Sequence, residues 1–478
     1  MDSQENLSRK VVPIAPVAAT SAEAGDSTQE VISLYVAHQK IYPRSVQGLF
    51  AYWRWALVFI TQIIFYGLPW LEWGQRQAVL FDLGSRRFYI FSLVLYPQDF
   101  IYLTGLLIIS ALSLFLFTAV AGRLWCGYAC PQTVYSELFM WIERKIEGDR
   151  SARMRLDDGD FSLEKLVKKW YKHILWIGVS IWTGFTFVGY FTPIRTLLGE
   201  VASATLGSWE TFWILFYSFA TYGNAGWMRE QVCKYMCPYA RFQSAMFDHD
   251  TLIVTYDENR GEPRGGRSHQ VDPKANHLGD CIDCTLCVQV CPTGIDIRKG
   301  LQYECIGCGA CADVCDNVMD KMGYARGLVR YTTQNAMKNN WSRREIWRRV
   351  MRPRVQIYTM VLLAIVLMLL VSLGLRTPFK VDVVRDRSTL SRITEEGALE
   401  NVYRLQIMNA SELEQTYHLK AQGLPNIKIE TQTDVVVAPA QSRWVVVRVN
   451  IPYGSIPAGS HPIKFEIQAA NTRDYVVE

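Results

Sequence analysis

Eight cysteines between residues 281 and 315 form two copies of the spacing C-x-x-C-x-x-C-x-x-x-C. Bacterial ferredoxins hold two [4Fe–4S] clusters with this run, and the last cysteine of each copy binds the other cluster. We therefore predict two cluster ligand sets. They are Cys281, Cys284, Cys287 and Cys315 for one cluster, and Cys305, Cys308, Cys311 and Cys291 for the other. Zinc sites favour separated C-x-x-C pairs, so the spacing indicates an electron-transfer protein rather than a zinc-binding or disulfide-linked one.

The four remaining cysteines form a second repeat. The runs from Cys126 to Cys130 and from Cys233 to Cys237 both read C-x-Y-x-C, and a proline follows each run. Positions i and i+4 share one face of a helix, so each pair can present two sulfurs to one metal, and the proline is expected to end or kink the helix. Because each motif follows an apolar span and the two spans should run parallel, we expect the pairs to converge on one site.

The residue types leave the occupant of that site open. Soft thiolates favour Cu(I), and they also bind zinc or a third iron–sulfur cluster. A dithiol can instead cycle to a disulfide and release electrons, although redox pairs more often read C-x-x-C. The nearby Met228, Met236, Met246 and His249 are candidate additional ligands, with packing as their ordinary role. No Rossmann fingerprint or flavin motif is present in the sequence, so we expect an external electron donor.

The segments that position these cysteines are strongly apolar. Half of the 478 residues are hydrophobic, 13% are aromatic and 15 are tryptophan. A run of about 20 apolar residues can span a bilayer. The chain is therefore expected to form a five-span α-helical transmembrane bundle, with spans near 52–71, 100–120, 174–191, 209–227 and 355–375.

Basic residues predict the orientation of the spans. Ten Lys and Arg residues lie between Arg123 and Lys172, whereas the loop after the third span offers only Arg195. The positive-inside rule then places the N-terminus and the ferredoxin segment in the cytoplasm and the C-terminus across the membrane, although three arginines after the first span oppose this weakly. All 12 cysteines fall on the reducing side of that arrangement. The net charge of +5 is too small and too dispersed to suggest nucleic acid.

The expected domain organisation has five parts. The N-terminal arm is polar and has no apolar core, which excludes a cleaved secretory signal. The last hundred or so residues contain short β-branched segments separated by Gly, Pro and Asn, a pattern that is typical of an antiparallel sandwich. An immunoglobulin-like topology fits this tail, and a docking or stabilising role is expected for it. The parts are a cytoplasmic arm at 1–48, four spans with both C-x-x-x-C-P motifs at 49–248, a cytoplasmic ferredoxin domain at 249–345, the fifth span at 346–377 and the sandwich at 378–478.

The chain combines paired C-x-x-x-C-P motifs after spans with a double ferredoxin motif, a last span and a β-sandwich tail. This combination resembles the CcoG family, also called FixG or RdxA. The match covers nearly the whole chain beyond the N-terminal arm. The resemblance implies a multi-pass protein of the bacterial inner membrane, with a periplasmic sandwich, that reduces Cu(II) to Cu(I) during assembly of the cbb-type cytochrome c oxidase. It implies copper at the catalytic residues Cys126, Cys130, Cys233 and Cys237. It also implies copper chaperones, a copper-transporting ATPase and oxidase subunits as partners.

One position departs from the ferredoxin consensus, because Asp316 rather than proline follows Cys315. The change removes no ligand, and an acidic neighbour should lower the cluster potential slightly. Thiolates stabilise Cu(I), so copper reduction should be downhill from a low-potential cluster. Direct electron transfer and a dithiol cycle both stay open.

Two other functions also stay open. One is a polyferredoxin electron conduit like NapH and NosR, which share the paired C-x-x-x-C-P motifs and serve respiratory reductases. The other is a metallochaperone that passes on Cu(I) without turnover. An odd number of spans suggests a homodimer, and the sequence does not settle whether a quinone takes part.

Overall fold

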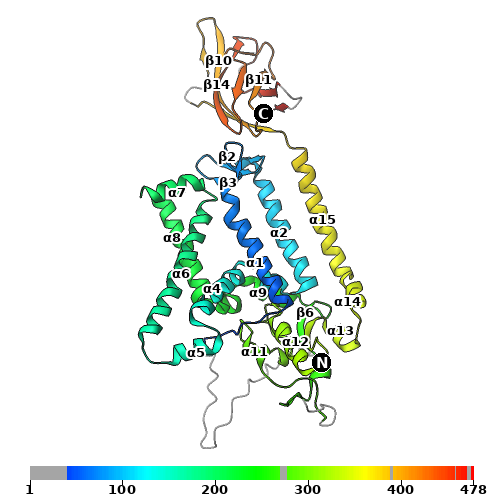
Figure 1. Ribbon diagram of the computed structural model, residues 1–478. Helices are drawn as coiled ribbons and strands as arrows, with labels where there is room; N and C mark the ends of the chain where they lie inside the picture. Colours follow the sequence, from blue (N-terminus) through cyan, green and yellow to red (C-terminus); the bar gives the residue numbers. More distant parts are fainter. Residues whose placement is uncertain (1–39, 270–276, 388–390, 458, 471–474, 478) are drawn as a thin grey trace, which may run out of the picture. The chain divides into compact units, whose positions relative to one another are not determined.

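The computed structural model describes residues 40–269, 277–387, 391–457, 459–470 and 475–477 (Figure 1). Most of the expected N-terminal arm therefore lies outside the described residues. The chain divides into two compact units, Met1–Lys40 and Ile41–Glu478. The helices and strands of the described residues all belong to the second unit.

Helices make up most of the first half of the chain, and two π-helical turns connect the last two of them. The elements are α1 Leu49–Gly67, α2 Phe100–Ala121, α3 Leu124–Tyr128, α4 Pro131–Glu147, α5 Arg150–Asp158, α6 Leu163–Val188, α7 Ile194–Ala202, α8 Ser208–Tyr222, the π-helical turns η3 Gly223–Met228 and η4 Val232–Met236, and α9 Pro238–Met246. The second half contributes α10 Glu258–Gly261, α11 Leu286–Gln289, α12 Ala310–Met322, α13 Gln334–Asn339, α14 Arg343–Val350 and α15 Pro353–Gly374.

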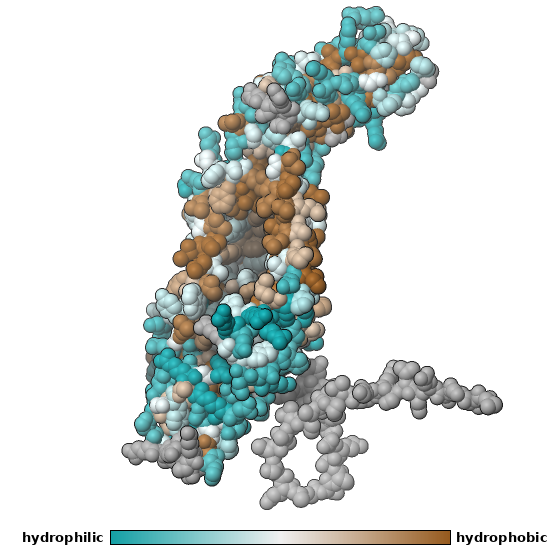
Figure 2. Space-filling model, turned by 90° about the vertical axis from the view of Figure 1, so that its right-hand side faces the viewer, coloured by the Kyte–Doolittle hydropathy of each residue, from teal (hydrophilic) through white to brown (hydrophobic). Residues whose placement is uncertain are grey.

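Three helical segments among the described residues are long and apolar enough to cross a membrane. They are Leu49–Trp70, Pro97–Ala121 and Pro353–Gly374, and they contain α1, α2 and α15. Apolar side chains, brown in Figure 2, form a band between hydrophilic regions on the face shown there. The helices α2 and α15 lie side by side (Figure 1), and the Tyr102 hydroxyl of α2 donates a hydrogen bond to the Ser372 carbonyl oxygen of α15 at 3.2 Å.

The segments expected as the third and fourth spans form α6 and α8, which are not among the three. Lysines crowd the first half of α6, and α8 contains only 15 residues before the chain enters η3. These helices pack closely at Gly184, where an added Cβ would lie 2.5 Å from the Ile214 carbonyl oxygen. The five-span bundle stays a prediction.

The eight-cysteine segment lies between two paired strands. Strand β6 (Ile253–Tyr256) pairs antiparallel with β7 (Val329–Thr332). Buried Val254, Tyr256 and Leu328 pack around the first cysteine, Cys281. Helix α11 contains Cys287, and α12 contains Cys311 and Cys315. The other cysteines of the segment flank these helices, and the 3-10 turn η6 (Ile297–Lys299) lies between them.

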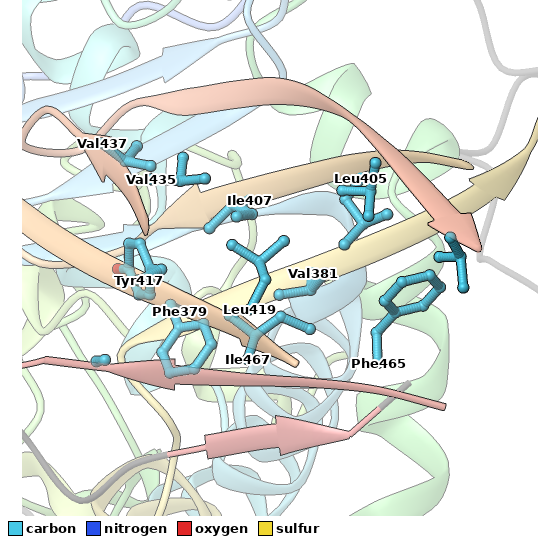
Figure 3. Close-up of a cluster of buried hydrophobic side chains, with 13 residues drawn as sticks. Phe379, Val381, Leu405, Ile407, Tyr417, Leu419, Val435, Val437, Phe465 and Ile467 are labelled. Atoms are coloured by element: carbon cyan, nitrogen blue, oxygen red, sulfur yellow. The ribbon is translucent and has the colours of Figure 1, made fainter. Parts of the chain in front are cut away.

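Two antiparallel sheets form the C-terminal sandwich. Their strand orders are β12-β14-β10-β8, with β9 paired to β10, and β13-β11-β15-β16. The strands are β8 Phe379–Arg385, β9 Arg392–Ile393, β10 Ala398–Asn409, β11 Gln415–Gln422, β12 Lys428–Ile429, β13 Asp434–Val437, β14 Ser442–Pro452, β15 Lys464–Ala469 and β16 Tyr475–Val477. Figure 3 shows inward side chains of both sheets, such as Leu405, Tyr417 and Phe465, filling the space between them. Alternate residues point inward because successive side chains of a strand face opposite sides.

A small β structure that the sequence did not predict connects α1 to α2. Its strands are β1 Glu72–Trp73, β2 Arg76–Gln77, β3 Val79–Asp82, β4 Arg87–Ile90 and β5 Leu93–Leu95. The Tyr96 hydroxyl donates to the Asn409 carbonyl oxygen at 2.9 Å, and Arg87 Nη1 donates to the Ala440 carbonyl oxygen at 3.1 Å. These contacts attach the sandwich to the β structure that follows the C-terminal end of α1.

The opposite end of α1 is attached to the cysteine-rich segment. The Asp313 carboxylate of α12 accepts hydrogen bonds from the backbone N–H groups of Phe50 (3.0 Å) and Ala51 (2.7 Å). The first N–H groups of a helix have no partner within the helix and carry positive partial charge, so a carboxylate stabilises them. A Cβ at the N-cap residue Gly48 would lie 2.3 Å from Asp313 Cγ, so the cap leaves room only for glycine.

Replacing Asp313 by Ala leaves both N–H groups without their acceptor. We expect the free energy of opening the first turn of α1 to fall by about 1–2 kcal/mol, whereas Asp313→Asn keeps an acceptor oxygen and costs less. Hydrogen exchange of the peptide that contains Phe50 and Ala51, measured in detergent, tests this expectation. Peptides from β10 serve as the internal control, and unchanged exchange at Phe50 and Ala51 in the alanine variant would contradict the capping role.

Candidate metal centre

The four cysteines predicted for the first cluster line one cavity. Cys281, Cys284, Cys287 and Cys315 meet there, and the walls between them are mainly apolar, with Val318 and Leu328 among them. Burial raises the pKa of the Cys287 thiol to about 11 and that of Cys315 to about 12. Four thiols in an apolar enclosure are the donor set of a [4Fe–4S] cluster, so these residues fit that group.

The four cysteines predicted for the second cluster are also neighbours. Burial raises the pKa of the Cys305 thiol to about 12, and nearby Cys308 and Cys291 raise it further. Cys311 is surrounded in the same way by Cys308, Cys305 and Cys291. Cys291, the last cysteine of the first copy, thus lies with the second copy, as the crossed spacing predicts. Burial also raises the pKa of Cys308, and the Arg54 guanidinium of α1 counteracts that rise.

A single metal ion has no ready-made site in the described part of the chain. No three Cys, His, Asp or Glu side chains among those residues converge closely enough to hold one ion. A [4Fe–4S] cluster does not require such convergence, because each thiolate binds a different iron. The spread of the ferredoxin cysteines is therefore compatible with [4Fe–4S] clusters.

The four cysteines of the C-x-x-x-C-P motifs lie together. Cys126 is on α3 and Cys233 is on η4, while Cys130 and Cys237 are the N-cap residues of α4 and α9. Burial raises the pKa of Cys126 to about 11 and of Cys233 to about 12, and the other cysteines of the two motifs contribute to both shifts. The two pairs approach one another without converging on one ion.

The prolines act differently from our expectation. Pro131 and Pro238 are the first residues of α4 and α9, so each proline begins a helix rather than ending one. Proline is favoured at this position because its missing N–H would have no helical partner there. Each motif therefore places its second cysteine at the start of a new helix, with an extended backbone at Cys130 and Cys237.

Gln132 joins the two motifs. Its side-chain nitrogen donates to the carbonyl oxygens of Asn224 (2.9 Å) and Arg229 (3.0 Å), which flank the chain leading to Cys233. Arg229 has a positive φ of 36°, which is strained for a residue other than glycine. Its guanidinium donates to Glu143 Oε2 at 3.0 Å. The second motif is thus held in place by contacts from α4.

Glu143 is the centre of a buried ion network. Arg153 and Arg229 each lie 3.0 Å from Glu143 Oε2, and Lys172 bridges Glu143 and Glu147. Burial opposes ionisation of Glu143, but the cations, Arg229 foremost, lower its pKa to about 2. Breaking one buried pair would leave an uncompensated charge, so the network fixes α4, α6 and the η3–η4 junction relative to one another.

The first motif also touches the second cluster loop. A Cβ at Gly127 would lie 2.8 Å from both Cys308 Cα and the Ile306 carbonyl oxygen. The Arg123 guanidinium donates to the Tyr303 carbonyl oxygen and, through Nε, to Gln243 Oε1 at 2.8 Å, and the Cys126 thiol lies 3.6 Å from that same oxygen. The first C-x-x-x-C-P motif is therefore packed directly against the loop that carries Cys308.

Several residues that hold the site were not predicted from the sequence. Gln132, Arg229 and Gly127 carry no motif signal apart from their closeness to the cysteines. Arg54 could have been found, because an arginine inside an apolar span is functional by default. Of the residues considered as extra ligands, His249 pairs through Nδ1 with Gln334 Oε1, and the Met236 side chain is 58% exposed.

Gly127→Ala inserts a methyl group between the first motif and the cluster loop. We expect it to destabilise the protein by about 1–3 kcal/mol and to lower iron and acid-labile sulfide per chain. Gly178→Ala is the matched control, because an added Cβ at Gly178 meets nothing within 4 Å. Thermal unfolding and iron content of both variants test this, and equal behaviour of the two variants would show that the contact at Gly127 is unimportant.

Three family models match the chain. A "4Fe-4S dicluster domain" covers residues 228–334, a "4Fe-4S binding domain" covers 103–148, and an "IG-like fold at C-terminal of FixG" covers 369–478. The second of these contains Cys126 and Cys130. The immunoglobulin-like character predicted for the sandwich is thereby confirmed.

Curated relatives match over most of their length. "Nitrogen fixation protein FixG" of Rhizobium meliloti is 39% identical over 444 residues, covering 86% of this chain and 84% of the relative. "Protein RdxB" of Cereibacter sphaeroides is 40% identical over 419 residues, covering 85% and 88%. "Protein RdxA" of the same organism is 38% identical over 439 residues, covering 89% and 92%.

A crystal structure of a FixG-related protein from Vibrio parahaemolyticus covers 21% of this chain and 92% of its own, at 20% identity and a TM-score of 0.20, which is too low to compare folds. The relatives, the tail and the cysteine motifs agree. The chain belongs to the family of FixG, RdxA and RdxB, and it is an iron–sulfur protein of the oxidoreductase type.

Proposed function

We propose that the protein reduces Cu(II) to Cu(I) for copper delivery during assembly of the cbb-type cytochrome c oxidase. The observation that supports this best is the position of four soft ligands beside a predicted electron carrier. Cys126, Cys130, Cys233 and Cys237 are grouped together, and Gly127 touches the loop that carries Cys308. Thiolates favour Cu(I) over Cu(II), so a thiol site beside a low-potential donor favours reduction.

In this proposal, residues of the chain bind the copper ion and give it access to the thiols. Two [4Fe–4S] clusters, when bound, supply electrons one at a time. We propose that thiolates of Cys126, Cys130, Cys233 and Cys237 hold the copper. Copper binding displaces the thiol protons, which burial otherwise retains. Each Cu(II) takes up one electron and leaves as Cu(I).

A route to the thiols is present on one side. A narrow cavity is lined by Cys233, Glu230 and Glu137, and it shares Arg54, Glu137 and Pro292 with a larger cavity of about 410 Å³. Cys126, by contrast, is only 8% exposed. Copper is therefore proposed to enter at Cys233. Copper chaperones, a copper-transporting ATPase and the oxidase subunits are the proposed partners.

The five-span arrangement in a bacterial inner membrane is likewise a proposal. The ferredoxin-like segment is attached to the N-terminal end of α1 through Asp313, and the sandwich is attached beyond its C-terminal end through Tyr96. If α1 crosses the membrane, the two parts lie on opposite sides. We propose a cytoplasmic ferredoxin segment and a periplasmic sandwich.

A reporter fused after Glu478 tests this orientation. Alkaline phosphatase, which folds only in an oxidising compartment, is expected to be active there, and a fluorescent protein that folds only in the cytoplasm is expected to be dark. The same reporters fused after Asn340 should give the reverse pattern. Cytoplasmic behaviour at Glu478 would be incompatible with the proposed topology.

Replacing both Cys233 and Cys237 by Ser tests the copper site. We expect the rate at which dithionite-reduced, desalted protein forms Cu(I), at up to one Cu(I) per reduced cluster, to fall by more than about tenfold, since even outer ligand changes cost about that much affinity. The ferredoxin clusters should remain, as measured by electron paramagnetic resonance. Met236→Leu is the control, because Met236 lies between the two cysteines and is exposed.

The variant with both Cys233 and Cys237 replaced by Ser also distinguishes the copper reductase from a second candidate function, a polyferredoxin electron conduit. The model described as a "4Fe-4S binding domain" matches the segment of Cys126 and Cys130 and supports iron–sulfur ligation there. If this candidate is correct, the Cys233/Cys237 variant loses part of its iron and of its resonance signal. Loss of copper reduction with full iron content supports the copper site instead.

A further inference from the structure

A separate cavity lies where α1 and α2 meet the ferredoxin-like segment. Its volume is about 1050 Å³, at the upper end of the range for small-molecule sites. Leu57 of α1 and Phe117 of α2 form part of an apolar wall, and Trp53 and Phe117 are 55% and 37% exposed on segments that could cross a membrane. An apolar ligand dissolved in the bilayer could therefore enter between these helices.

Hydroxyl groups form the polar end of this cavity. Tyr128 and Tyr331 both line it, and their hydroxyl oxygens lie 3.1 Å apart. The Tyr331 hydroxyl donates its hydrogen to the Gly307 carbonyl oxygen at 2.6 Å, which can only accept. Tyr128 must then be the donor to Tyr331, so the lone pairs of the Tyr128 oxygen are left to accept a hydrogen bond from a ligand hydroxyl.

The hydroxyl chain ends at the cluster loop. Gly307 precedes Cys308, a predicted ligand of the second cluster, and Cys308 is fully buried in the same core as Cys126. A ligand bonded to Tyr128 would be connected to the backbone of that loop by three hydrogen bonds, its own bond to Tyr128 included. This is the position that an electron donor to the second cluster requires.

The lining disfavours a charged, water-soluble donor. The cavity lining contains one arginine, Arg330, and its Nη2 atom is already paired with Asp257 Oδ2 at 3.0 Å. Among the residues that line the cavity, none offers an unpaired cation for the phosphates of a nicotinamide or flavin nucleotide. A long apolar ligand with hydroxyl groups at one end matches both the walls and the polar end.

We propose that this cavity binds an isoprenoid quinol and that the quinol is the electron donor for copper reduction, a role that rests on the proposed function. The quinol is oxidised to quinone and loses two electrons and two protons. The electrons reduce two Cu(II) ions to two Cu(I) ions. The Tyr128 oxygen holds the quinol by accepting a hydrogen bond from its hydroxyl group, and both protons pass to water.

Labelling of the holoprotein in detergent tests binding without copper. An azido-ubiquinone is expected to label peptides from α1, α3 or α14, and excess decylubiquinone should compete with it. Leu57→Trp fills the cavity and is expected to weaken binding by about tenfold or more. Ile60→Trp is the matched control, because Ile60 is on the same helix, 51% exposed and outside the cavity lining.

Turnover with two donors separates this inference from the proposed function. Decylubiquinol should drive Cu(I) formation above the protein-free rate in the wild type and in Ile60→Trp but not in Leu57→Trp, whereas clusters reduced with dithionite and then desalted should pass their electrons to Cu(II) equally in all three. Labelling that is absent, uncompeted or located elsewhere, or copper reduction by the pre-reduced protein without quinol-driven turnover, overturns the quinol site. Competed labelling without copper reduction by the pre-reduced protein leaves the quinone site standing and overturns the copper reductase.

Discussion

The contact between one carboxylate and the start of one helix connects the two halves of this protein. Asp313 lies between two predicted ligands of different clusters, Cys311 and Cys315, and caps the N–H groups of Phe50 and Ala51. A helix that starts at a membrane surface has few other partners for those groups. The position of the cysteine-rich segment is thereby tied to α1, and the close approach of Gly127 to Cys308 depends on that placement.

Burial governs the chemistry of the thiols. Cys126, Cys233, Cys305 and Cys315 all have raised pKa values because they are removed from water and surrounded by other thiols. A thiol in this state is a poor nucleophile and a weak ligand until a metal displaces its proton. Metal loading and the ordering of these loops are therefore expected to be coupled.

The sequence predicted the parts of the fold that depend on local pattern. The spacing of Cys291 and Cys315 predicted the crossed grouping of the ferredoxin cysteines, and alternation predicted strands such as β10 and β14. Strand β11 was missed although its apolar residues Tyr417, Leu419 and Ala421 alternate with polar ones, and the β1–β5 structure was missed because its strands have two to four residues. The roles of Gln132, Gly127 and Asp313 could not be predicted, since each depends on a partner about 90 to 260 residues away.

The π-helical turns make the two C-x-x-x-C-P motifs unequal despite their matching letters. The first cysteine of one motif is on an α-helical turn and faces the cluster loop, whereas its counterpart Cys233 is on η4 and lines a cavity. A wider turn shifts the register of the side chains, and such turns are frequent at functional sites. The repeat is therefore asymmetric, because Cys126 is packed in the same core as Cys308 whereas Cys233 borders an empty space. If the thiols take up copper as proposed, Cys233 is the sulfur that an incoming ion meets first.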